Sequence, residues 1–270
     1  MNSRRILVLA LLSALSTAGC MQKSAEAPAS DAMAATAASG DMKAPVGGDM
    51  AAPAASGDMA MASEAAAMST AHYQVTFASR WTAADHPLEY PAPEYLGLAV
   101  AHFSGLIGAS HKAGYSLFAE GSKPSPGLER LSEMGKHDPL NDEIAAAIQS
   151  GQALAMVEST EPLKDHTKTE TADVAVDTEH SRVSLVAMIA PSPDWFAGVK
   201  DVDLMENGQW VAEKTIDVMP FDSGGDDGTT YRADDIDTNP KKPTSSLNGN
   251  PHFTYNGKFL PVAKVTFKKM

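Results

Sequence analysis

Apolar and polar residues alternate in several short segments after residue 72, a pattern that predicts β-strands. Residues 73–78 alternate throughout, as in a strand with one buried face. Residues 182–190 are apolar at both sets of alternating positions, which predicts a central strand that is buried on both faces. The predicted strands are 73–78, 115–118, 153–158, 182–190, 209–219 and 261–268.

Apolar residues at helical spacing predict three helices. Ser125-Pro126 is typical of a helix start, and Asp138 is the expected N-cap of the last helix, with Pro139 as its first residue. The predicted helices are 94–108, 125–134 and 138–148. Because these helices do not alternate regularly with the strands, we expect a mainly β fold, an antiparallel β-sandwich with a small helical insert.

The chain begins with a segment that is typical of a secretory signal. Two arginines precede an apolar run, and small residues then lead to Cys20. The Ala-Gly-Cys sequence resembles a bacterial lipobox, which implies a lipoprotein signal peptide at 1–19 and lipid attachment at Cys20. Thr17 departs from the Leu that is usual at its position, and an ordinary cleaved signal is the alternative. The residue after the cysteine is Met21, where a lipoprotein kept at the inner membrane has Asp. In this respect the chain resembles lipoproteins that a Gram-negative host sorts to the outer membrane.

Residues 20–71 are rich in Ala, Met, Gly and Asp and contain no aromatic residue, Ile or Leu. Such a segment buries too little apolar surface to offset its chain entropy, so we expect a disordered tether before a folded domain at 72–270. Several methionines lie in the tether, including the pair Met59 and Met61. Thioethers are soft ligands for Cu(I), so copper binding is an alternative to a repeat that merely carries Met.

The composition excludes several classes of protein. A net charge of −13 argues against nucleic-acid binding, which needs a basic face. The single cysteine excludes an intrachain disulfide framework and a Cys₄ or Cys₂His₂ zinc site.

Two acidic segments are candidates for chemistry. Asp222 and Asp226 flank two glycines, which suits a loop that folds around a hard cation, although a solvated acidic loop is the alternative. Asp194 and Trp195 follow two prolines directly after the buried strand, where a simple capped strand end is the alternative. The chain has neither an HExxH nor a G-x-S-x-G motif, so nothing supports a zinc or serine hydrolase.

These segments together closely resemble the spondin N domain family, the domain of F-spondin and mindin. The PSPDW and D-x-G-x-D motifs carry the likeness most specifically, and the resemblance covers about residues 72–268. The segments that carry it are 191–199, 203–204, 208–211 and 220–228, and those that look like the family's first strand, histidine segment and last strand are 73–81, 108–116 and 260–265.

The resemblance implies a C2-like sandwich that binds one calcium at one end, through Asp194, Asp222 and Asp226. Asp227 departs from the small polar residue common in the family and is a candidate spare ligand or outer partner of these aspartates. The animal domains carry a disulfide that reaches the 203–204 segment. Here Met205 stands where that cysteine would be, so the fold must do without the bridge.

We therefore expect a non-enzymatic, lipid-anchored protein of the bacterial cell envelope, at the outer membrane, with a calcium-binding domain for adhesion or ligand recognition. Its expected partners are the membrane, through the lipid, and an envelope or extracellular protein or glycan. The first alternative is copper handling through the tether. The second is an envelope hydrolase that combines the calcium-side carboxylates with His111.

Overall fold

The computed structural model describes residues 69–91, 94–95, 98–159, 161–165 and 168–270. The predicted signal peptide, Cys20 and nearly all of the predicted tether, with Met59 and Met61, lie outside these residues. No helix in the described part is long and apolar enough to cross a membrane.

Strands dominate the described part of the chain, as the hydrophobic pattern predicted. The long strands are β1 (Thr70–Ser79), β5 (Ile107–His111), β6 (Ala153–Glu158), β7 (Thr169–Asp177), β8 (Arg182–Ala190), β9 (Trp195–Asp203), β12 (Glu213–Asp222) and β16 (Ala263–Lys269). The two-residue strands are β2 (Glu94–Tyr95), β3 (Leu98–Ala99), β4 (His102–Phe103), β10 (Met205–Glu206), β11 (Gln209–Trp210), β13 (Ser245–Ser246), β14 (Thr254–Tyr255) and β15 (Lys258–Phe259). The helices are α1 (Pro126–Met134) and α2 (Leu140–Gln149).

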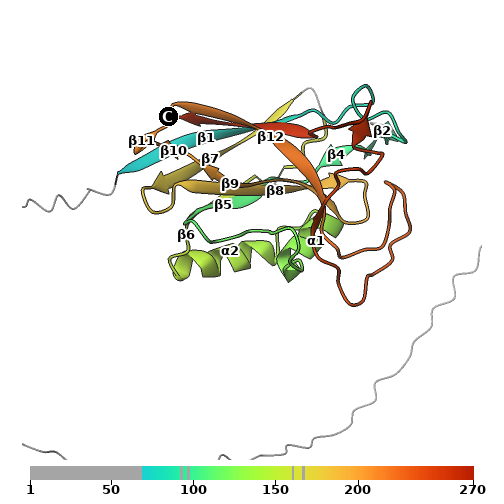
Figure 1. Cartoon of the computed structure of the whole chain (residues 1–270), viewed down its shortest axis with the longest axis horizontal. Helices are drawn as coiled ribbons and strands as arrows, with labels where there is room; N and C mark the ends of the chain where they lie inside the picture. The colour runs from blue at the N-terminus through green and yellow to red at the C-terminus, as the bar shows by residue number, and fades with distance from the viewer. Residues whose placement is uncertain (1–68, 92–93, 96–97, 160, 166–167) are drawn as a thin grey trace, which may run out of the picture. The chain divides into compact units, whose positions relative to one another are not determined.

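The long strands form one antiparallel sheet in the order β6-β5-β8-β9-β12-β16-β1-β7. This sheet folds back on itself into two layers, with β1 and β7 in one layer, β5, β8 and β9 in the other, and the helices outside the latter (Figure 1). Strand β12 joins the layers, because residues 213–218 pair with β16 and residues 219–222 pair with β9. The predicted antiparallel β-sandwich with a helical insert is confirmed.

Two cores hold the layers together. The larger lies between the two layers of the sheet and includes Tyr73, Phe77, Trp81, Leu185 and Trp195. The smaller lies between the outer face of β5, β8 and β9 and the two helices. Strand β8 contributes to both, with alternate residues in the larger core and Val186 in the smaller, so the prediction of a strand buried on both faces is confirmed.

Helix α1 begins as its sequence predicted. The Ser125 Oγ accepts a hydrogen bond from the Leu128 N–H (3.1 Å), and Pro126 is the first helical residue. For α2 the N-cap prediction is wrong: the cap is Pro139, and it makes no side-chain hydrogen bond, so Asp138 does not cap the helix. The carboxylate of Glu143 on α2 instead accepts from Ser125 and the Gly127 N–H, which joins the starts of the two helices.

The helix predicted at 94–108 is wrong. The described residues there form β2, β3, β4 and the start of β5. All five residues of β5 are buried because β6 and β8 flank it and both of its faces are covered, so its sequence shows no alternation. The strand predicted at 115–118 is also wrong, because these residues have no strand pairing.

The two ends of the sandwich differ. We call the end with the turn 191–194 and the loop 223–244 the loop end, and the end with β10, β11 and the start of β1 the hairpin end (Figure 1). The loop end contains the three predicted calcium ligands.

Candidate functional site

The sheet itself brings Asp194 and Asp222 together. Asp222 is the last residue of β12 and pairs in register with Trp195, the first residue of β9. Asp194 directly precedes Trp195, so the two aspartates lie on neighbouring strands although 28 positions separate them in the sequence. The Ser223 N–H also donates to the Asp194 backbone carbonyl (3.2 Å).

The Asp194 side chain organises the start of the loop. It is completely buried, and its Oδ2 accepts hydrogen bonds from the Ser223 hydroxyl (2.9 Å) and from the backbone N–H groups of Gly224 (2.9 Å), Gly225 (2.7 Å) and Asp226 (3.1 Å). Its Oδ1 is buried and has no hydrogen-bond partner in the described residues. A buried carboxylate oxygen without a partner is rare, because its lost hydration is not replaced.

The two aspartates affect each other electrostatically. Burial raises the pKa of Asp194, although the hydrogen bonds from the loop favour its charged form. Burial and the nearby charge of Asp194 raise the pKa of Asp222 to about 6, against a hydrogen bond from the Gly224 N–H to Oδ1 (2.9 Å). The two carboxylates lose hydration on burial, and their negative charges repel each other. A cation between them would offset both effects.

Asp226 and Asp227 have other contacts. The buried Asp226 carboxylate accepts from the N–H groups of Gly228 and Ile236, so it closes the segment 226–236 into a loop. The exposed Asp227 accepts from Lys242 and from the Thr238 hydroxyl (2.7 Å), and these contacts lower its pKa. Asp227 thus lies in an ion pair with Lys242.

A second acidic group adjoins this site, and sequence reasoning missed it. One oxygen each from Glu129, Glu133 and Asp237 lies within 4.8 Å of the others. Lys241 lies among them: its Nζ contacts Glu129 (2.8 Å) and Asp237, and donates to the Gly225 carbonyl (3.0 Å). Burial, followed by the charge of Glu129, raises the pKa of Glu133 to about 7. A lysine already supplies the cation here, and no local sequence signal joins α1 to residues 237–241.

Two glycines allow the loop to approach its neighbours closely. Gly224 has φ +89°, and a Cβ there would lie 2.2 Å from the Lys242 carbonyl oxygen. A Cβ on Gly225 would lie 2.7 Å from Glu133 Oε1. Gly224 is therefore required by its backbone conformation and by the Lys242 backbone, whereas a Cβ on Gly225 would meet the movable end of the Glu133 side chain.

The donor set fits a hard cation in part. Asp194 offers a buried oxygen without a partner, and Asp222 accepts the Gly224 N–H through Oδ1 and lies beside the Trp195 side chain. Both oxygens of Asp226 already accept backbone N–H groups, so its contribution would require these hydrogen bonds to be shared. Oxygen ligands of this kind are those that calcium prefers.

His111 lies at the opposite end of the molecule. It pairs with Arg182 at the start of β8, whereas Asp194 follows the end of β8, and a strand of nine residues spans about 27 Å. Its Nδ1 contacts the Lys112 carbonyl (2.8 Å) and its Nε2 the Ser184 hydroxyl (2.8 Å), and burial lowers its pKa. The hydrolase alternative, which combined His111 with the calcium-side carboxylates, is therefore contradicted by the geometry.

Comparison with known proteins places this fold and these loops in one family. The family model Spondin_N matches residues 71–261. The chain belongs to the spondin N-terminal domain family. It is 33% identical to Spondin-2 of Rattus norvegicus over 208 residues, which are 74% of this chain and 62% of the relative. It is 31% identical to Spondin-2 of Homo sapiens over 212 residues (76% and 63%) and 31% identical to Spondin-1 of Xenopus laevis over 217 residues (76% and 26%).

The resemblance to the spondin family read from the motifs is thus confirmed. The chain spans less than two thirds of the length of each of these relatives. In this spondin domain, which lacks the disulfide of the animal domains, hydrogen bonds join β1 and the residue before it to residues 204–211. The Tyr73 hydroxyl donates to the Val211 carbonyl (2.6 Å), with the Leu204 carbonyl at 3.4 Å, and Trp210 Nε1 donates to Ser69 Oγ (3.1 Å).

Proposed function

We propose that this protein is a lipid-anchored envelope protein whose spondin domain binds one calcium at the loop end and serves in adhesion or ligand recognition. The observation that carries the calcium proposal is the buried Asp194 Oδ1, which has no hydrogen-bond partner in the described residues. A calcium ion bound to Asp194 and Asp222 would replace the hydration that these carboxylates lose.

The ligand roles that we propose are unequal. Asp194 and Asp222 would be the main carboxylate ligands, because Asp194 keeps an oxygen without a partner in the described residues and Asp222 lies on the neighbouring strand. Asp226 would bind the ion while it continues to hold the loop 226–236. Calcium would then fix the turn 191–194 against the loop and set the surface that a partner meets.

The recognition part of the proposal rests on family membership. The relatives are named spondins, and the family's animal domains serve interactions at the cell surface and in the matrix, so an adhesive role is an analogy from them. The lipobox-like sequence supports lipid attachment at Cys20, and Met21 in place of Asp supports an outer-membrane location. Several acyl chains would give a stable anchor, and residues 20–71 would separate the domain from the membrane.

Calcium titration by calorimetry, combined with thermal unfolding, tests the metal site. At a calcium concentration of about 100 Kd, binding should stabilise the domain by about 2.7 kcal/mol and raise Tm by about 5–10 °C. Asp194→Asn and Asp222→Asn should abolish the calcium-dependent shift, and Asp173→Asn on the exposed face of β7 is the matched control. A Tm that is the same in EGTA and in calcium, without heat of binding, would refute the calcium proposal.

Fractionation of cells that produce the native protein or Cys20→Ser tests the anchor. The native protein should incorporate labelled fatty acid and sediment with outer membranes, whereas Cys20→Ser should do neither. A pull-down from envelope and culture-supernatant extracts, with and without calcium, then tests partner recognition. Release of the captured partner by EGTA is expected, and equal capture without calcium would separate recognition from the metal.

A further inference from the structure

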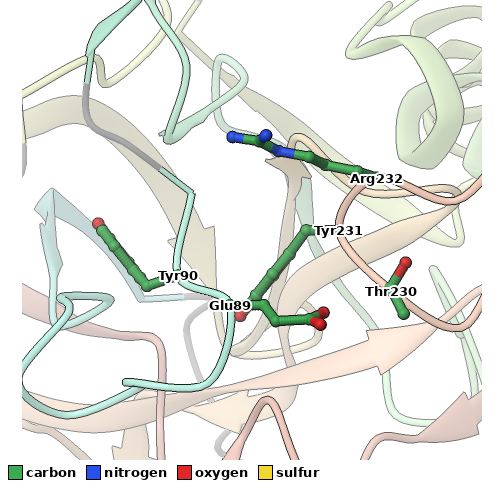
Figure 2. A pocket seen from close by; sticks show the side chains of 5 residues that line it. All are labelled: Glu89, Tyr90, Thr230, Tyr231 and Arg232. Atoms are coloured by element: carbon green, nitrogen blue, oxygen red, sulfur yellow. The ribbon is translucent and has the colours of Figure 1, made fainter.

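The loop end contains a cavity that none of the three aspartates lines. Its volume is about 470 Å³, and its lining residues are Glu89, Tyr90, Thr230, Tyr231 and Arg232 (Figure 2). The first two come from the segment after β1, and the others from the loop after β12. Cavities of this size are typical of sites for small molecules.

Two tyrosines line the cavity, and each is held by a hydrogen bond with Trp81. The Tyr90 hydroxyl donates to the Trp81 carbonyl (2.9 Å), and the Tyr231 hydroxyl accepts from Trp81 Nε1 (3.1 Å). The Tyr231 ring also packs against the rings of Trp195 (5.3 Å between centroids) and His252 (4.9 Å). Tyr231 is almost completely buried (3% exposed), so the half-buried Tyr90 is the tyrosine that can offer ring surface to a ligand.

Two opposite charges lie in this cavity without neutralising each other. Arg232 is exposed and makes no ion pair or hydrogen bond with the described part of the chain, Glu89 included. In the view of Figure 2 its guanidinium lies on one side of the two tyrosines, and the Glu89 carboxylate lies on the other, turned toward Thr230. An arginine and a glutamate in one small cavity would ordinarily pair, so their separation leaves both available to a ligand.

The Glu89 side chain is held in place. The buried His252 contacts its Oε2 through Nε2 (3.1 Å), which leaves Oε1 for a ligand. Glu89 also has φ +49°, a conformation that is unfavourable for a residue with a side chain and that the surrounding loop must maintain.

We propose that this cavity binds a small zwitterion of the amino-acid or short-peptide type. The ligand's ammonium group would lie against Glu89 and an aromatic face, and its carboxylate would accept a two-pronged hydrogen bond from Arg232. A neutral ligand would leave both protein charges unpaired, and a polyanion would meet the repulsion of a chain with net charge −13. None of the three aspartates lines the cavity, although Asp226 closes the loop that carries its residues 230–232. The inference rests on the lining residues and not on the calcium proposal.

Calorimetric titration of the full-length protein with glycine, diglycine and triglycine tests the inference, because the distance between the two ligand charges increases along this series. One member should bind best, and removal of either of its charges, as the N-acetyl form or the C-terminal amide, should weaken binding about tenfold. Glu89→Gln should bind the free and N-acetylated forms equally, and Arg232→Gln should bind the acid and the amide equally. Asp173→Asn and Lys268→Gln, which change exposed charges on β7 and β16, should behave as the native protein.

The inference fails if none of the three probes binds, or if the capped forms bind as well as the free ones. It also fails if methyl glucoside binds with an affinity that neither Glu89→Gln nor Arg232→Gln changes, because the cavity would then be a sugar site. The best-binding probe should still bind to Asp194→Asn, and it should still bind to the native protein in EGTA. This arm separates failure of the calcium proposal from failure of this one.

Discussion

The two ends of the sandwich shift the pKa of a buried aspartate in opposite directions. At the hairpin end, burial tends to raise the pKa of Asp177, but hydrogen bonds from the His180 side chain (2.8 Å) and backbone outweigh it and leave the pKa low. At the loop end, four hydrogen bonds to Asp194 do not outweigh burial, and its pKa is raised. The difference is that the His180 side chain bonds to Asp177, whereas burial dominates the pKa of Asp194.

This contrast indicates which end satisfies its buried polar groups without a bound ion. The hairpin end satisfies its buried polar groups through its own residues, including Tyr73, His111 and His180. The loop end leaves Asp194 Oδ1 without a partner. Variants at the two ends should therefore differ in size of effect and in their response to calcium.

The largest effect is expected for Asp194→Ala. Its removal takes an acceptor from the Ser223 hydroxyl and from three backbone N–H groups, of which Gly224 keeps its bond to Asp222 Oδ1 and Gly225 its weaker bond to Ser223 Oγ. We expect this loss to destabilise the domain by about 4 kcal/mol and to lower Tm by about 10 °C. Thermal unfolding in EGTA measures this apart from any metal. Asp173→Ala is the control, and an equally small effect of both variants would show that Asp194 does not organise the loop.

The second largest effect is expected for Gly224→Ala, which should lower the free energy of unfolding by about 3 kcal/mol. The new Cβ would meet the Lys242 carbonyl at 2.2 Å, in addition to the strain of φ +89°. Gly249→Ala is a close control, because its φ is +91° and no atom lies within 4 Å of a Cβ there, so that it should lose only about 1 kcal/mol. Urea unfolding of both variants isolates the clash, and equal losses would contradict it.

At the hairpin end, Asp177→Asn should cost about 2 kcal/mol at pH 7, because hydrogen bonds to a charged carboxylate are lost. The folded-state pKa of Asp177 lies below its ordinary 3.8, so its contribution is complete above that value and disappears as the pH falls through the folded-state pKa. Unfolding free energies of both proteins, measured between pH 2 and pH 7, should therefore converge at the acid end. A constant difference across this range would argue against the ionised form as the cause.

Tyr73→Phe should have the smallest effect, about 1 kcal/mol, through loss of the hydrogen bond to the Val211 carbonyl. Because Tyr73 belongs to the hairpin end, the calcium-dependent Tm shift should remain unchanged in this variant. A reduced calcium shift in Tyr73→Phe would show that the two ends are not independent.

Much of the fold followed from local patterns, and the failures have physical causes. Strand β8 and helix α1 were predicted because the strand is apolar on both faces and the helix has a typical N-cap. Strand β7 was missed because two of its buried positions, Glu170 and Asp177, carry charges. Strand β9 was not among the predicted strands, and its Gly198, which here packs against Phe118, is an unusual strand residue.

The candidate site was predictable only through the family's motifs. Spacing alone does not place Asp194 beside Asp222, since that requires the pairing of β9 with β12. The position of Lys241 among Glu129, Glu133 and Asp237 joins a helix to a distant loop, and only the tertiary structure reveals it. The calcium ligands and the lipid anchor stay predictions.

The position of β1 has a mechanical consequence. This strand pairs with β16 on one side and with β7 on the other, over nearly its whole length. A membrane anchor would pull on the start of β1, and a partner held at the loop end would pull in the opposite direction. Antiparallel hydrogen bonds lie perpendicular to the strands, so this tension would shear both ladders at once and would not open them bond by bond. Under the proposed anchoring, the two ladders would therefore resist a force applied between the start of β1 and the loop end.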